Sequence, residues 1–182
     1  MKTLVVNFSG KISVGNGESI GRFICDASCH APQLINYRDL RIHACSCCNY
    51  ECFLDNNHCR YITDDLVALY DSILCADKVF FIIPVYSDYP CSNYFSFRER
   101  SQCYFDETSF EKYQNLNIKF VVIANNGFEN TVQVIHSDFP LLDDKTILQL
   151  SSERYNTKSI NGDLLQYDDV RERILGFMDD CS

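Results

Sequence analysis

The segment that decides the fold is KVFFIIP, residues 78–84. Its apolar residues follow one another without alternation, which is typical of a central parallel strand that is covered on both faces. Shorter apolar runs stand at residues 3–8, 34–37, 116–124 and 146–150. We therefore expect a mostly parallel sheet of about five strands.

Segments with helical spacing separate these runs. Apolar residues share one helical face in 18–25, 66–74 and 168–178, and a further helix is expected from Glu129 onward. Thr63-Asp64-Asp65 offers an N-cap and an acidic first turn to the second of these helices. The alternation predicts one α/β domain over residues 1–182, with helices on both faces of a doubly wound sheet.

Composition narrows the classes of partner. The formal charge of −9 works against loose binding to nucleic acid or to anionic lipid, because both depend on Lys and Arg. The sequence contains no apolar run of membrane-spanning length, and its first residues lack the pattern of an export signal. We expect a cytoplasmic protein that binds neither nucleic acid nor membrane and keeps most of its eleven cysteines reduced.

Three loops that follow strands carry candidate binding residues. In open parallel sheets, ligands bind beyond the carboxyl ends of the strands. The first loop, residues 9–17, leads into a helix, where free N–H groups and the helix dipole favour a phosphate. The loop at 84–90 offers an aromatic ring, and the loop at 124–127 ends in a glycine that allows close approach of the backbone. The first loop lacks the glycine patterns of dinucleotide-binding and nucleoside triphosphate-binding loops, which excludes both of these kinds of site.

Together these residues resemble the family of flavodoxin-like NAD(P)H-dependent FMN reductases. Members open with a strand followed by Ser-x-Arg-x-x-Gly-Asn-Ser/Thr. Here Ser9, Lys11, Gly15, Asn16 and Gly17 stand in that pattern, with Lys for Arg and one extra residue before the Gly-Asn pair. The match to the family's Pro-Val-Tyr loop is direct at 84–86, and Phe97-Arg98-Glu99-Arg100 is similar to its Phe-x-Asp-Arg. The resemblance implies a flavodoxin-like three-layer sandwich whose five-stranded parallel sheet has the order 2-1-3-4-5.

The resemblance also implies a function. An FMN-binding oxidoreductase of this kind takes hydride from NADH or NADPH and passes electrons to a quinone, free flavin or other acceptor. No side chain need act as acid or base, so we name no catalytic residue. Gly17 lacks the hydroxyl that Ser or Thr usually offers the phosphate, and Ser13 or Ser19 would have to replace it. The cofactor-binding residues that we expect are Ser9, Lys11, Ser13, Gly15, Asn16, Gly17, Pro84, Val85, Tyr86, Ser87, Asn125, Asn126 and Gly127.

Members of the family commonly form dimers or tetramers in which a neighbouring subunit covers the flavin. A homo-oligomer is therefore expected here. The aromatic stretch at residues 94–97 fits such an interface and fits ordinary core packing equally well.

A cluster of cysteines lies between the second strand and the second helix. Cys45, Cys48, Cys52 and Cys59 look similar to the set that holds a [4Fe-4S] cluster in the iron-sulfur flavoprotein branch of the family, although the spacing departs from it by one residue. Four thiolates also suit zinc, and packed thiols or a reversible disulfide are further interpretations. His43 and His58 flank the cluster, where an exposed loop histidine is the simpler account of each.

Two rival functions follow from this cluster. One is a non-enzymatic electron carrier that relays electrons between FMN and an iron-sulfur cluster. The other is a zinc-binding module that keeps the fold without the flavin.

Overall fold

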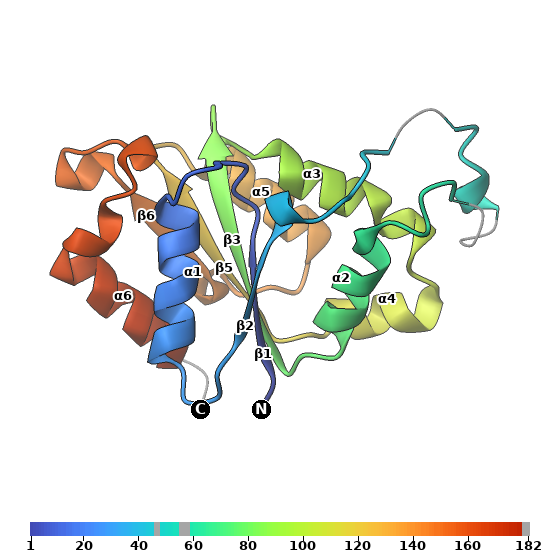
Figure 1. Ribbon diagram of the computed structural model, residues 1–182, viewed down its shortest axis with the longest axis horizontal. Helices are drawn as coiled ribbons and strands as arrows, with labels where there is room; N and C mark the ends of the chain where they lie inside the picture. Colours follow the sequence, from blue (N-terminus) through green and yellow to red (C-terminus); the bar gives the residue numbers. More distant parts are fainter. Residues whose placement is uncertain (46–47, 55–58, 180–182) are drawn as a thin grey trace.

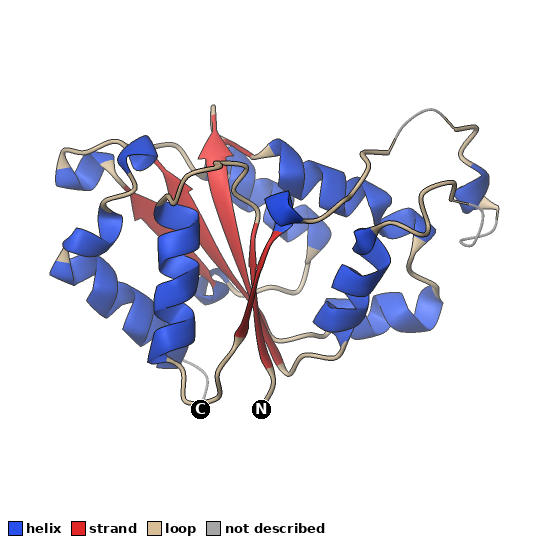
Figure 2. Cartoon of the chain, in the orientation of Figure 1, coloured by secondary structure: helices blue, strands red, loops and turns tan. Residues whose placement is uncertain are grey.

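Five parallel strands form the centre of the molecule. The computed structural model describes residues 1–45, 48–54 and 59–179. Neighbouring strands pair in the order β2-β1-β3-β5-β6, and the short strand β4 pairs antiparallel with β3 (Figure 2). Counted among the parallel strands alone, this is the expected order 2-1-3-4-5, whereas β4 was not expected. The strands are β1 (Thr3–Asn7), β2 (Gln33–Asn36), β3 (Lys78–Tyr86), β4 (Tyr89–Pro90), β5 (Ile118–Ala124) and β6 (Ile147–Ser151).

Helices cover both faces of this sheet. In Figure 1, α1 (Asn16–Ala27) and α6 (Asp168–Asp179) lie on one side. The opposite side carries α2 (Asp65–Leu74), α3 (Ser92–Glu99), α4 (Glu107–Gln114) and α5 (Glu129–Asp138). The helices expected at 18–25, 66–74, 129 onward and 168–178 are confirmed. No helix in the described ranges is long and apolar enough to cross a membrane.

Successive residues of the central strands face opposite layers. Leu4 and Val6 belong to the core beneath α2 to α5, whereas Val5 between them belongs to the core beneath α1 and α6. Both cores are fully buried, which explains why the sequence of β3 shows no alternation. At the end of β1, the ring of Phe8 packs against the buried rings of Tyr94 and Phe97. Core packing is therefore the role of these two members of the aromatic stretch.

A buried ion pair between Asp64 and Arg100 connects the end of the segment between β2 and α2, which carries the clustered cysteines, to the end of α3. Arg100 is 2% exposed and donates from Nη1 to Asp64 Oδ2 at 2.8 Å. Arg100 also donates to the carbonyls of His43 and Tyr61. Asp64 caps α2 by accepting from the N–H of Leu66 at 3.1 Å, so the Thr63-Asp64-Asp65 signal is confirmed with Asp64 as the cap. The pair joins three parts of the chain at one point.

Replacing Asp64 by Ala is expected to lower the free energy of unfolding by about 3–5 kcal/mol, because it leaves the buried guanidinium of Arg100 without its counter-charge. Urea unfolding followed by circular dichroism measures the change. Asp65→Ala is the matched control, since the Asp65 carboxylate bonds the N–H of Arg41 at the surface. We expect that change to cost less than about 1 kcal/mol.

The same pair predicts a pH dependence. Burial works to raise the pKa of Asp64, but hydrogen bonds from Arg100, His43 and Leu66 outweigh it and hold the pKa below its ordinary value. The stabilisation is therefore complete above the ordinary Asp pKa of about 3.9 and is lost as the pH falls through the folded-state pKa. The stability gap between the wild type and Asp64→Ala should stay constant from about pH 7 to 5 and shrink below about pH 4. A gap that widens on acidification would contradict this assignment.

Candidate functional site

A cleft opens at the carboxyl edge of the sheet, which is the upper edge in Figure 1. Its volume is about 130 Å³, and it lies among the loop after β1, the end of β3 and a segment that follows β6. The topology makes this edge the expected position for a ligand. The lining residues are Ser9, Lys11, Gly15, Asn16, Gly17, Pro84, Val85, Tyr86, Ile123, Ser159 and Ile160.

The start of α1 forms the floor of the cleft. Gly15 is the N-cap and has extended backbone angles, and no side chain caps the helix. Asn16, Gly17 and Glu18 are buried, and within the described part of the chain their N–H groups have no hydrogen-bond acceptor. A buried helix start whose donors lack partners is a site that favours an anion, because the free N–H groups and the helix dipole both point outward there.

Gly17 allows α1 to begin against β1. A Cβ at Gly17 would lie 2.5 Å from Oδ1 of Asn7, an atom that already accepts from the N–H of Ser9. Asn7 is fully buried and donates from Nδ2 to Oδ1 of Asn36 on the neighbouring strand β2. Asn7 therefore fixes the first loop, and the space for a Ser or Thr side chain at position 17 is already filled.

Charges beside the helix start are balanced by arginines. Glu18 pairs with Arg22 and Arg38, and hydrogen bonds from Arg22 and then Arg38 hold the pKa of Glu18 below its ordinary value. Arg38 also donates to the carbonyl of Lys11, which fixes the loop. Lys11 then adds its own positive charge at the rim of the cleft.

A covering segment, residues 157–164, lies over the first loop. Asn16 donates from Nδ2 to the carbonyl of Ser159 at 2.8 Å and accepts at Oδ1 from the N–H of Leu164 at 3.0 Å. Lys11 donates from Nζ to the carbonyl of Ile160 at 2.7 Å. Ser159 and Ile160 belong to a single 3₁₀ turn, η7 (Ser159–Asn161). Two predicted binding side chains thus contact the protein's own backbone, and the sequence carried no signal for this contact.

The end of β3 is held by a tight hairpin to β4. Ser87 and Asp88 form its two-residue turn with φ angles of 51° and 70°, the conformation that matches the twist of paired strands. Thr131 donates to the carbonyl of Asp88, which anchors the turn to α5. Tyr86 lines the cleft and is 60% exposed, whereas Tyr89 across the hairpin does not line it.

Five predicted residues do not line the cleft. Ser13 and Ser87 are exposed in their loops. The third loop contributes only indirectly, because Asn125 accepts from the N–H of Ser159 at 2.8 Å and so holds the covering segment. Asn126 instead donates a hydrogen bond from Nδ2 to the carboxylate of Glu153. Gly127 borders a separate hollow beside α5, and β5 reaches the cleft through Ile123.

The four predicted metal-binding cysteines share one small cavity elsewhere. Cys45, Cys48, Cys52 and Cys59 line a space of about 20 Å³ together with Arg100 and a fifth cysteine, Cys103. Among the described residues, no group of three or more His, Cys, Asp or Glu side chains is arranged to hold a metal ion. The structure therefore lends no support to the [4Fe-4S] expectation.

The two histidines near these cysteines have different outcomes. His43 stacks on Tyr61 with ring centroids 4.4 Å apart, and most of its side chain is exposed. His58 lies outside the described residues.

Several solved structures of other proteins share this fold, although no match is found by sequence. No family model matches the sequence, and no curated protein matches it. Solved structures do match, among them the Trp repressor binding protein of Bacillus subtilis, with 14% identity, a TM-score of 0.67 and coverage of 100% of this chain and 99% of that one.

Two further matches are flavin proteins by name or by content. RosB, with the bound intermediate 8-demethyl-8-formylriboflavin-5'-phosphate, has 12% identity, a TM-score of 0.63 and coverage of 96% and 76%. FerB, a flavoenzyme NAD(P)H:(acceptor) oxidoreductase from Paracoccus denitrificans, has 13% identity, a TM-score of 0.58 and coverage of 99% and 94%. The chain has a flavodoxin-like fold. At these identities the similarity extends to the fold alone.

Replacing Gly17 by Ala is expected to destabilise the protein by about 1–3 kcal/mol, because the new methyl group overlaps Asn7. Gly10→Ala in the same loop is the control, since its nearest neighbour would be Nδ2 of Asn93 at an ordinary 3.6 Å. That change should stay within about 0.5 kcal/mol of the wild type. Equal stability of both variants in urea would show that α1 does not begin against Asn7.

Proposed function

We propose that this protein binds FMN in the cleft and uses it to pass electrons from NADH or NADPH to an acceptor. The observation that carries the proposal is the buried start of α1, whose N–H groups lack acceptors and lie beside Lys11. An aromatic side chain, Tyr86, stands in the same cleft at the end of the central strand. A phosphate and a flat aromatic ring need this combination of groups.

The phosphate group of FMN would lie in the first loop. The N–H groups of Asn16, Gly17 and Glu18 and the hydroxyl of Ser9 are the donors that would hold it. Lys11 supplies a positive charge at the rim. Gly17 leaves the backbone at this point open to close approach, since no side chain can occupy that position without displacing Asn7.

The ring end fits the last residues of β3. Pro84, Val85 and Tyr86 line the cleft, and the hairpin to β4 fixes their direction. The exposed ring of Tyr86 offers a flat apolar surface to an isoalloxazine. Partial desolvation of the Tyr86 phenol raises its pKa, so the hydroxyl stays protonated at neutral pH.

The covering segment must shift when FMN binds. The cleft holds about 130 Å³, less than the roughly 300–1,000 Å³ of ordinary cofactor sites. Lys11 and Asn16 would exchange the carbonyls of Ile160 and Ser159 for the ligand, and part of the ring would lie outside, over Tyr86. This open side also leaves room for the neighbouring subunit of a homo-oligomer, which we include in the proposal.

Bound FMN would supply the chemistry of accepting hydride and releasing electrons. The residues of this chain bind it, orient it and shield part of it from water, and none is needed as an acid or a base. RosB and FerB support the proposal, because proteins with this fold include one that holds a flavin phosphate and one that oxidises NAD(P)H. No observation favours the two rival functions, an iron-sulfur electron carrier and a flavin-free zinc-binding module, since the described cysteines are not arranged around a metal.

Replacing Lys11 by Ala should weaken FMN binding by about tenfold relative to riboflavin binding, because the lost charge acts on the phosphate, whereas the lost bond to the Ile160 carbonyl affects both ligands alike. Quenching of flavin fluorescence measures both affinities. Lys158→Ala is the control, because Lys158 is an exposed lysine next to η7 that does not line the cleft. A wild type that binds riboflavin as tightly as FMN, or binds neither, would contradict the proposed phosphate site.

Replacing Tyr86 by Ala should weaken FMN and riboflavin by the same factor, about three- to tenfold, because the ring contact is common to both. Tyr89→Ala is the matched control across the hairpin, since Tyr89 is 49% exposed and lies outside the cleft lining. Its effect should stay below about twofold. The outcome that speaks against this placement of the ring is a larger loss in Tyr89→Ala than in Tyr86→Ala.

A further inference from the structure

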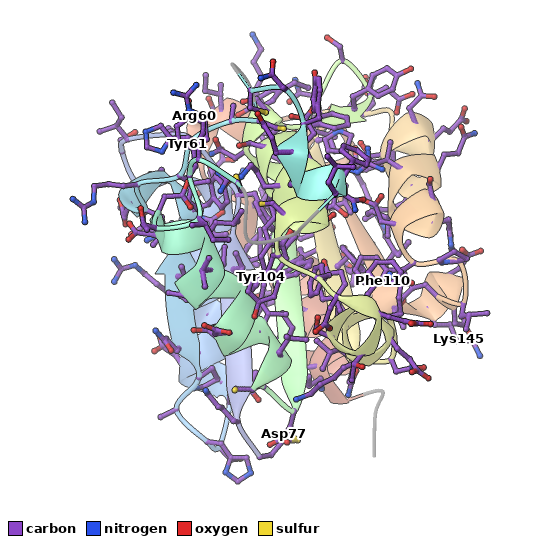
Figure 3. All side chains as sticks on the ribbon, turned by 90° about the vertical axis from the view of Figure 1, so that its right-hand side faces the viewer. Arg60, Tyr61, Asp77, Tyr104, Phe110 and Lys145 are labelled. Carbon is purple, nitrogen blue, oxygen red and sulfur yellow. The ribbon has the colours of Figure 1, made fainter. Side chains whose placement is uncertain are left out.

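The small cavity beneath Arg100 gathers five thiols from two distant parts of the chain. Four come from the segment between β2 and α2, and the fifth, Cys103, comes from the 3₁₀ turn η4 (Arg100–Cys103) after α3. Figure 3 turns this face of the molecule to the viewer, with Arg60 and Tyr61 from the rim of the cavity labelled. The flavin cleft shares no lining residue with this cavity.

Cys59 and Cys103 both line this small cavity. Cys103 is 4% exposed and donates from Sγ to the carbonyl of Arg100 at 2.9 Å. Burial raises the pKa of the Cys103 thiol to about 11, and the neighbouring Cys59 thiol adds to that rise. Cys59 is only half-buried, so it is the more accessible member of the pair.

Arg100 adds an unused donor at the same place. Its Nε–H is buried and has no hydrogen-bond partner in the described part of the chain, although the rest of the guanidinium is fully paired. The guanidinium also lies beside the sulfur of Cys103 and works to lower the pKa of that thiol. A buried donor without an acceptor favours a state in which a nearby group becomes negative. A sulfur that is losing its proton is such a group.

We propose that Cys59 and Cys103 are a redox-active dithiol that a hydroperoxide oxidises to a disulfide. The cavity of about 20 Å³ is large enough for a molecule of the size of water or hydrogen peroxide. This inference is independent of the proposed flavin site.

The reaction proceeds in two balanced steps. The Cys59 sulfur attacks one peroxide oxygen, the O–O bond breaks, and the products are a Cys59 sulfenic acid and water. The Cys103 sulfur then attacks the Cys59 sulfur, forming the S–S bond while the S–O bond breaks, and the proton of Cys103 leaves with the hydroxyl as a second water. Two thiols lose two electrons in total, and these reduce the peroxide. Arg100 Nε–H stabilises Cys103 while it carries negative charge.

Cys103 is a better partner for Cys59 than the neighbouring Cys52. All three thiols line the same cavity, but Cys103 stands in the same turn as Arg100 and donates to the Arg100 carbonyl. Its sulfur is therefore next to the guanidinium that would stabilise a negative charge there. The disulfide would tie the segment that leads to Asp64 to the turn that carries Arg100, and so would reinforce an ion pair that already joins them.

The test is peptide mapping of the purified full chain after reduction, treatment with hydrogen peroxide and alkylation. We expect the loss of two of the eleven free thiols, one cross-linked peptide pair joining Cys59 to Cys103, and full reversal by dithiothreitol. Cys103→Ala should leave Cys59 as a sulfenic acid that dimedone traps. Cys29→Ala should behave as the wild type, because Cys29 is exposed and lies outside the cavity.

Three results would overturn the proposal. One is a disulfide that joins Cys59 to Cys52, and another is oxidation of Cys59 in the wild type without any cross-link. The third is zinc that co-purifies in stoichiometric amount and protects the thiols from peroxide. Mapping of the wild type decides among these outcomes even where Cys103→Ala fails to fold.

Discussion

Parallel pairing of β1 with β3 is the constraint on which the candidate site depends. Asn7 pairs with Ile82, and the N–H of Phe8 continues the ladder to the Ile82 carbonyl, so the two strands end at the same edge. That register places the first loop beside the end of β3. Because Asn7 is then buried, its side chain can hold both the loop and the neighbouring strand, and α1 can start against it only through a glycine.

The polar groups of the cleft form one connected arrangement. Asn125, at the end of β5, holds the N–H of Ser159, and Asn16 at the start of α1 holds the Ser159 carbonyl. The covering segment is therefore held by hydrogen bonds to two loops, the one after β1 and the one after β5. A ligand that competes for Asn16 and Lys11 would release one side of this segment while Asn125 keeps the other. The third loop would then act on the flavin through the covering segment and not by direct contact.

Much of the fold could be predicted because its central strands are continuous apolar runs and most of its helices show helical spacing of apolar residues. The helix α4 could not, since only Tyr113 in it is buried and its start depends on the capping box of Asp106 with Ser109. The covering segment escaped prediction for a different reason, because its bonds to Asn16 join residues more than 140 positions apart. Cys103 is likewise isolated in the sequence. Only the fold places it, through η4, in the same cavity as Cys59.

In the proposed complex, the free N–H groups at the start of α1 bind the phosphate of FMN. Phosphorus NMR of FMN mixed with the protein is the decisive measurement. We expect a bound resonance that is shifted from that of free FMN and holds its position between about pH 5 and 8, because the helix start keeps the phosphate dianionic through its ordinary second pKa of about 6. A phosphorus resonance that follows the titration of free FMN over this range would contradict it.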